Sequence, residues 1–153
     1  MALSFGKILS SLALSLSALL GLLQPPTRTT LSTLTLSHKN GTISAELASS
    51  PTEQAQGLSG RISLNPNAGM LFVFPDDRQP LFWMKDMNFP LDIVWIKDNK
   101  IIKIDKNLPP EGKRPAKTYT SGTPVNYVLE FNAGFCDQNN IKVGDEIKYH
   151  LFN

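Results

Sequence analysis

From residue 31 onward the chain is a series of short runs in which apolar and polar residues alternate. Alternation is clearest on both sides of Asn40-Gly41, in "TLTLSHKNGTISAELA", and this dipeptide favours a tight hairpin turn. Further stretches have the composition of strands and are separated by Pro, Asp, Asn and Gly. They read "GMLFVF", "PLFWMKDM", "PLDIVWI", "IIKIDKN", "NYVLEFNAG" and "DEIKYHLF". The longest irregular stretch covers residues 107–118.

Two short helices are predicted among these strands. In "SPTEQAQGLSGR", Ser50 can cap a helix, Pro51 suits its first position and Glu53 completes a capping box. A second short helix is predicted around residues 135–139. Many short strands with two small helices predict a mainly β (α+β) domain. We expect a small β-barrel-like rolled sheet of mostly antiparallel strands.

The pattern also predicts which residues of one hairpin face each other. If residues 98–99 form a two-residue turn, Lys97 pairs with Lys100, and Asp92 lies opposite Asp105. Two opposed carboxylates repel, so a cation is expected between or beside them. One face of the hairpin is apolar and is predicted to join the core: Ile93, Trp95, Ile102 and Ile104.

The N-terminus has the layout of a targeting segment. Lys7 is followed by an apolar run over residues 8–23, and two prolines stop any helix at residues 25–26. Residues 1–26 are therefore predicted to be a signal peptide or a membrane anchor, residues 27–33 a linker, and residues 34–153 a single domain. The protein is expected to be exported, either periplasmic or extracellular, or tethered to the membrane through residues 8–23.

Charge and cysteine content narrow the partners. The chain has 15 Lys and Arg against 13 Asp and Glu, and leaving out Lys7 leaves 14 against 13. A nearly neutral domain lacks the basic footprint of a nucleic-acid-binding protein. A single cysteine, Cys136, excludes an internal disulfide and is predicted to pack as a small buried hydrophobe. The expected partner is a small molecule or an envelope protein, and the sequence identifies no cofactor.

Candidate chemistry is concentrated around "PLFWMKDMNFPLD", where charges lie among aromatic and sulfur-containing residues. Lys85 and Asp92 could meet across the turn between two strands, and Glu130 could point to the same rim. Polar groups among aromatics are typical of a binding site. The predicted ligand-binding residues are Trp83, Met84, Lys85, Asp92, Asp105, Glu130 and Arg61.

Three alternatives stay open beside a binding or accessory module. An enzyme could use Asp92 and Glu130 as acid and base, with Lys85 as a further catalytic candidate and a divalent cation as an option. The same carboxylates could instead stabilise the fold by accepting hydrogen bonds from loop N–H groups and Arg61. A soft metal such as Cu(I) could bind the thioethers of Met70, Met84 and Met87 beside Trp83. No nucleophile–base or metal-binding motif is present in the sequence.

Several motifs occur in an order that resembles the domain-of-unknown-function 192 family. They are "GLSGR", "GMLFVF", "FWMKDM", "PLDIVWI", "NLPP", "YVLEFNAG" and "IKVGD", spread from about Leu36 to the C-terminus. The resemblance implies a small β-rich, barrel-like domain, often behind a signal sequence or membrane anchor, and implies no activity. One departure is Asp86, where the family pattern has Asn. The matching positions are Gly57, Leu58, Arg61, Gly69, Met70, Phe72, Phe82, Trp83, Met84, Lys85, Pro90, Leu91, Asp92, Glu130, Asn132, Ala133 and Gly134.

Overall fold

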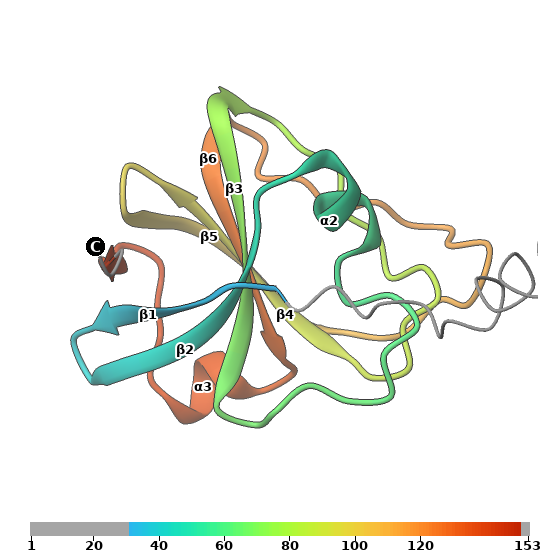
Figure 1. Cartoon of the computed structure of the whole chain (residues 1–153), viewed down its shortest axis with the longest axis horizontal. Coiled ribbons are helices and arrows are strands. Elements are labelled where there is room, and N and C mark those ends of the chain that lie inside the picture. Colours follow the sequence, from blue (N-terminus) through green and yellow to red (C-terminus); the bar gives the residue numbers. More distant parts are fainter. Residues whose placement is uncertain (1–30, 151–153) are drawn as a thin grey trace, which may run out of the picture. The chain divides into compact units, whose positions relative to one another are not determined.

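Seven strands and two short helices follow one another over residues 31–150, the part of the chain that the computed structural model describes (Figure 1). The predicted leader, residues 1–26, lies outside the described residues. The elements are β1 (Thr33–His38), β2 (Gly41–Ala48), α2 (Pro51–Gln56), β3 (Ala68–Arg78), β4 (Leu91–Lys97), β5 (Lys100–Leu108), β6 (Val125–Asn132), α3 (Phe135–Gln138) and β7 (Lys148–His150). The mainly β prediction with two short helices is confirmed.

The strands form one sheet in the order β5-β4-β6-β3-β2-β1-β7. All neighbouring pairs among the described strands are antiparallel except β2 and β3, which run parallel and are joined by a crossover that contains α2. The outer strands do not pair along their length, so the sheet does not close into a barrel. A single bridge between Lys100 and Glu146 brings the start of β5 to the segment before β7.

Each face of the sheet carries its own hydrophobic core. The first core includes Leu36, Leu71, Val94, Phe131 and Cys136, and it lies on the face that α3 covers. The second core lies on the opposite face, under the crossover and the loops. Its members are Ala48, Leu58, Leu64, Met70, Phe72, Phe74, Met84, Met87, Leu91, Ile93, Trp95, Leu108, Val125 and Val128. Both faces of β4 are consequently buried, with residues 91–96 all fully enclosed.

The predicted turns are present, but one register is wrong. Asp98 and Asn99 both have positive φ, +49° and +68°, as a two-residue hairpin turn requires, and Lys97 faces Lys100. The register then shifts between Ile96 and Trp95, because Ile102 is an extra residue on β5. Asp105 therefore lies opposite Ile93 and not opposite Asp92, so the predicted pair of facing carboxylates is wrong.

Residues 80–90 were predicted to begin with a strand, and this prediction is wrong. Only Phe82 pairs, through an isolated bridge to Tyr119. Asp86 has a φ of +52°, which no strand accommodates. Backbone hydrogen bonds hold this segment between two other loops: the Gly60 N–H donates to the carbonyl of Asp86 and the Asp86 N–H donates to the carbonyl of Gly112, both at 2.8 Å. The three loops form one end of the domain beside α2 (Figure 1).

The helix α2 begins as its local sequence predicts, whereas α3 begins after Gly134 without a side-chain cap. The Ser50 side chain accepts a hydrogen bond from the backbone N–H of Glu53, whose carboxylate accepts one in return from the backbone of Ser50.

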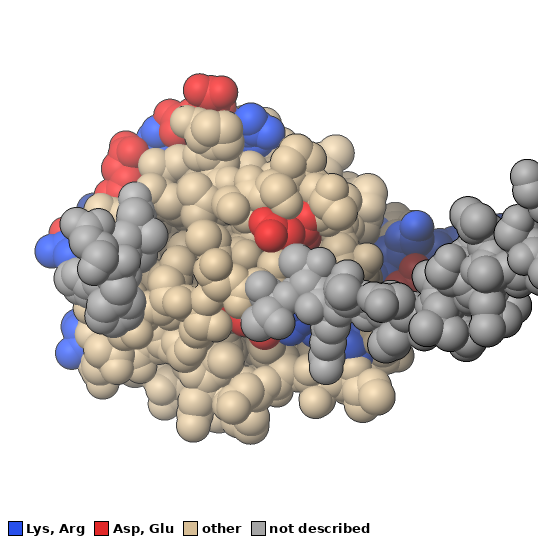
Figure 2. All heavy atoms as spheres, viewed as in Figure 1, with Lys and Arg blue, Asp and Glu red and all other residues tan. Residues whose placement is uncertain are grey.

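Within residues 31–150, no helix is long and apolar enough to span a membrane. Figure 2 shows that residues other than Lys, Arg, Asp and Glu cover most of the face seen in Figure 1. Charged side chains gather at its upper and left edges, and an acidic cluster lies near its middle.

Candidate functional site

A pocket of about 270 Å³ lies between α2 with its following turn and the segment 80–87. The Gln54 side chain donates a hydrogen bond to the carbonyl of Val73 at 2.8 Å and so holds α2 over β3. At the end of α2, Gly57 has a φ of +49°, and a Cβ there would lie 3.3 Å from the ring of Phe72. Because glycine has no Cβ, the turn after α2 packs directly against the Phe72 ring. The lining includes Gly57, Leu58, Phe72, Phe74, Leu81, Phe82, Trp83, Met87 and Glu130.

Glu130 is the one charged residue in this lining. It lies on β6 opposite Met70 of β3 and Ile93 of β4, so it points into the second core and only 5% of its surface is exposed. Its carboxyl has no hydrogen bond or ion pair with any residue of the described part of the chain. Burial raises the pKa of Glu130 to about 8, and the positive charge of Arg61 partly opposes this rise.

Aromatic rings form much of the remaining wall. The rings of Phe72 and Phe82 meet edge to face, with their centroids 4.9 Å apart, and Phe82 meets Trp95 in the same way at 5.4 Å. Trp95 is fully buried, whereas Trp83 lies at the lip of the pocket with 49% of its surface exposed. The pocket therefore has a fixed aromatic interior and one aromatic side chain at its entrance.

A second, wider hollow of about 640 Å³ adjoins the first. The two share Ala55, Gln56, Ser59, Trp83 and Met87, and together they form one groove, which we call the α2 groove. The second hollow is more polar, since Lys85, Asp86, Asn88 and Lys113 line it. A ligand in the α2 groove would thus meet an acidic aromatic pocket at one end and a mostly basic hollow at the other.

Arg61 lies close enough to Glu130 to influence its charge but is engaged elsewhere. Its guanidinium donates two hydrogen bonds to the carboxylate of Glu46, at 2.7 and 2.8 Å, and this pairing raises the pKa of Arg61. The expectation that Arg61 would donate to Asp92 or Glu130 is therefore wrong. Arg61 acts on Glu130 through charge, not through a hydrogen bond.

Asp92 is fully buried on the opposite face of the sheet from Glu130. It pairs in register with Phe131, whereas Glu130 pairs with Ile93, so the two carboxyl groups point to different sides of β4 and β6. The Asp92 carboxylate accepts hydrogen bonds from the backbone N–H of Asn107 at 2.9 Å and of Cys136 at 3.0 Å. The structure thus does not bring Asp92 and Glu130 together as an acid–base pair, and Asp92 has the geometry of a structural contact.

The other predicted residues are divided between core, hairpin and groove. Asp105 accepts a hydrogen bond from the indole N–H of Trp95 at 2.7 Å and pairs with Lys103 at 2.9 Å, away from Asp92. Lys85 is exposed at the second hollow, and the predicted Lys85–Asp92 pair is not formed, because Asp92 is enclosed on the first core. Met84 is fully buried in the second core, as is Met70, while Met87 also lines the α2 groove.

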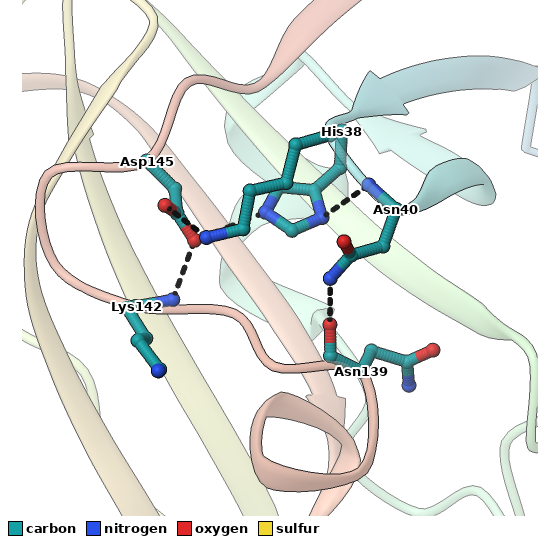
Figure 3. A network of polar contacts seen from close by, with 6 residues as sticks. His38, Asn40, Asn139, Lys142 and Asp145 are labelled. Carbon is teal, nitrogen blue, oxygen red and sulfur yellow. Dashed lines mark hydrogen bonds and ion pairs between the residues drawn. The ribbon is translucent and has the colours of Figure 1, made fainter.

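A separate polar network joins the β1–β2 hairpin to the loop before β7 (Figure 3). The Asp145 carboxylate contacts the His38 ring at 3.1 Å, accepts from the Lys39 ammonium at 2.7 Å and accepts from the backbone N–H of Lys142 at 2.8 Å. These contacts place the pKa of Asp145 below its usual range, with Lys39 as the largest cause.

Among the described residues, no three His, Cys, Asp or Glu side chains lie close enough together to hold a metal ion.

Sequence reasoning missed the pocket itself. Phe72, Phe74, Phe82 and Gly57 line it, yet their apolar character predicts only burial. Three of the four, Gly57, Phe72 and Phe82, are positions of the family motifs named above, and that was the available signal.

The model of DUF192, described as "Uncharacterized ACR", matches residues 33–149. A candidate transcription regulator from Sinorhizobium meliloti 1021 has a crystal structure that superposes with a TM-score of 0.71 and 32% identity, over 78% of this chain and 95% of that one. The crystal structure of a protein of unknown function from Novosphingobium aromaticivorans DSM 12444 superposes with a TM-score of 0.68 and 30% sequence identity, over 81% of this chain and 89% of that one. A comparison with curated proteins found no match. The chain belongs to the DUF192 family.

Proposed function

We propose that this protein is an exported binding module that takes a ligand into the α2 groove. The observation that carries the proposal is Glu130, a buried carboxyl that has no hydrogen-bond or ion-pair partner among residues 31–150 and forms part of the wall of an aromatic pocket. Export is supported by the N-terminal pattern of residues 1–26.

The energetics of Glu130 support a role in binding. Burying a carboxyl group without a hydrogen bond opposes folding, and native proteins pair nearly all such groups. Asp92 shows how this fold satisfies a carboxylate that serves structure: two backbone N–H groups donate to it. Glu130 has no such donors among residues 31–150, and because it lines the pocket, its partner comes from the pocket: water in the free protein, and a ligand when one is bound.

The α2 groove does not have the arrangement that catalysis usually needs. A general acid and a general base must both reach the reacting atoms, and Asp92, the expected partner of Glu130, lies on the other face of the sheet. Ser59 lines both hollows, but its hydroxyl donates to the carbonyl of Lys85 at 2.9 Å, and no histidine lines the groove within residues 31–150. Binding is therefore favoured over turnover.

The test uses the two tryptophans of the full chain as separate reporters. In ¹H–¹⁵N NMR spectra, the indole signal of Trp83 reports on the groove, and that of Trp95, which is hydrogen-bonded to Asp105, serves as an internal control. A screen of amines, carboxylates, sugars, nucleotides, short peptides and duplex DNA should yield a compound that moves Trp83 and leaves Trp95 in place. DNA should move neither signal.

Two variants decide whether such a compound occupies the groove. Trp83→Ala should weaken binding at least tenfold without unfolding the protein, because Trp83 is half exposed. Glu146→Gln is a matched surface control and should bind as the parent does. The proposal fails if no compound moves Trp83, or if every compound that does so binds Trp83→Ala equally well.

A further inference from the structure

We infer that the group received by the first pocket of the α2 groove is a primary alkylammonium, held by the Glu130 carboxylate in the pocket that Phe72, Phe82 and Trp83 also line. This inference rests on the proposed function and specifies the chemical class of its ligand. The source of the ammonium is either a free amine or the side chain of a lysine in a peptide.

The charge of the pocket wall selects a cation. Of the residues that line the pocket, Glu130 alone carries a formal charge, and the polar side chains beside it, such as Gln54, Gln56 and Ser59, are neutral. An anion would meet a carboxylate with no cation in the lining to balance it. A cation would itself supply the counter-charge that Glu130 lacks among the pocket residues, and it would favour the ionised form of that carboxyl.

The aromatic rings favour the same ligand. The face of an aromatic ring is the negative end of its quadrupole and attracts ammonium groups, most strongly where water is excluded. Phe82 is fixed by edge-to-face contacts with Phe72 and Trp95, so the aromatic wall is rigid before a ligand arrives. The apolar lining from Leu58 and Met87 would cover the methylene groups that carry the ammonium.

The adjoining hollow determines where the rest of the ligand would lie. Lys85 and Lys113 line it and favour carbonyl or carboxylate oxygens. An alkylammonium whose chain leads to such oxygens would therefore use both parts of the α2 groove. A lysine side chain with its peptide backbone has this order of groups.

The experiment compares three small probes of similar size: n-butylamine, n-butanol and butyrate. Each is titrated into the full chain while the Trp83 and Trp95 indole signals are recorded. Butylamine should bind at least tenfold more tightly than butanol at pH 8.5, and butyrate should not move Trp83. Glu130→Gln should lose this preference for the amine but still admit butanol, whereas Glu146→Gln should behave as the parent does.

The pH dependence gives an independent readout. Arg61, paired with Glu46, is the charged neighbour that shifts the pKa of Glu130, which lies at about 8. Butylamine stays protonated well above that pH. Glu130 is the only ionisable side chain that lines the first pocket, so it is the group there whose charge changes between pH 6 and pH 8. If the carboxylate form alone binds the amine, the affinity should rise about fifty-fold from pH 6 to pH 8. In Glu130→Gln the affinity should be independent of pH over this range.

The outcomes separate this inference from the proposed function. Equal binding of butanol and butylamine, or tighter binding of butyrate, overturns the alkylammonium but leaves a binding groove. Binding of butylamine that Glu130→Gln does not weaken also overturns it. If none of these probes moves Trp83, the inference fails, and the proposed function fails only if the wider screen is also negative.

A blocked Gly-Lys-Gly peptide distinguishes the two sources. Tighter binding of the peptide than of butylamine, reduced by Lys113→Ala, identifies a lysine side chain as the source. Equal or weaker binding of the peptide identifies a free amine. Either result supports the inference.

Discussion

The Asp92 carboxylate accepts a hydrogen bond from the backbone N–H of Cys136 at 3.0 Å, and this contact joins the start of β4 to the first turn of α3. A second N–H, from Asn107, donates to the other carboxylate oxygen at 2.9 Å. Asn107 has a φ of +55°, so Asp92 also holds an irregular position near the end of β5. One buried side chain thus connects three parts of the fold.

Replacing Asp92 with Asn should lower the free energy of unfolding by roughly 2–4 kcal/mol, because an amide offers one acceptor oxygen to two buried N–H donors. Urea unfolding of the full chain measures this loss. Asp137→Asn is a suitable control, since its carboxylate is 63% exposed and its pair with Lys106 should contribute less than about 1 kcal/mol. If Asp92→Asn unfolds at the same urea concentration as the parent, the structural role is wrong.

Glu130→Gln should change how stability depends on pH. The unfolded carboxyl has a pKa near 4.5 and the folded one a pKa of about 8. Between these values the folded protein retains a proton that the unfolded chain releases, so the contribution of Glu130 to stability is complete below pH 4.5 and is lost as the pH rises through 8. Glutamine has no such transition.

Unfolding free energies of parent and variant, measured from pH 4 to pH 9, test this dependence. The free energy of unfolding of the variant, relative to that of the parent, should increase steadily with pH. The variant should be the more stable of the two at pH 8.5. A difference that stays constant over the whole range would show that Glu130 has an ordinary pKa in the folded protein.

Substitutions at Asp86 should follow its backbone conformation and not its charge. A φ of +52° is tolerated by Asp, Asn and Gly but is strained for a β-branched residue. The free energy of unfolding of Asp86→Asn and Asp86→Gly should therefore stay within about 0.5 kcal/mol of that of the parent, whereas that of Asp86→Val should be lower by roughly 1–2 kcal/mol. Thermal melts of the three variants provide the comparison. A large loss in Asp86→Asn would instead point to a role for the carboxylate.

The Asp145 network should stabilise the protein mainly above pH 4. Its contacts with Lys39, His38 and the N–H of Lys142 lower the pKa of Asp145 in the folded state. A pKa that is lower in the folded state contributes stability at pH values above the pKa of the unfolded state, which is near 3.8. This stability is lost as the pH falls through the pKa of the folded state. Asp145→Asn should therefore be less stable than the parent at pH 6, and the difference should shrink toward pH 2.

The neighbouring Glu146 provides the control for this prediction. Its carboxylate is 65% exposed and pairs only with Lys148 at 3.3 Å, among the contacts of the described residues. Melting temperatures of Glu146→Gln should follow those of the parent between pH 2 and pH 6. A similar profile for Asp145→Asn would show that the network makes no pH-dependent contribution.

Features set by neighbouring residues were predictable from the sequence. The turn at Asp98-Asn99 and the capping box at Ser50 depend on side chains a few positions apart, and both are present.

Features set by distant contacts were not predictable. The extra residue at Ile102 reverses the faces of β5 beyond it, and apolar alternation continues on both sides of the shift. Alternation also gave the wrong environment for Asp92, since it assumes one solvent-facing side, whereas both sides of β4 are buried here. The side of β4 that carries Asp92 is buried by the first core and α3, whose residues are distant from β4 in the sequence.

The parallel pairing of β2 with β3 has a consequence for how this family can diversify. Parallel neighbours cannot be joined by a tight turn, so the chain must travel back along the sheet between Ala48 and Ala68. That return path supplies one whole wall of the α2 groove. Insertions or substitutions in the crossover can therefore reshape this wall while the strand pairings stay intact.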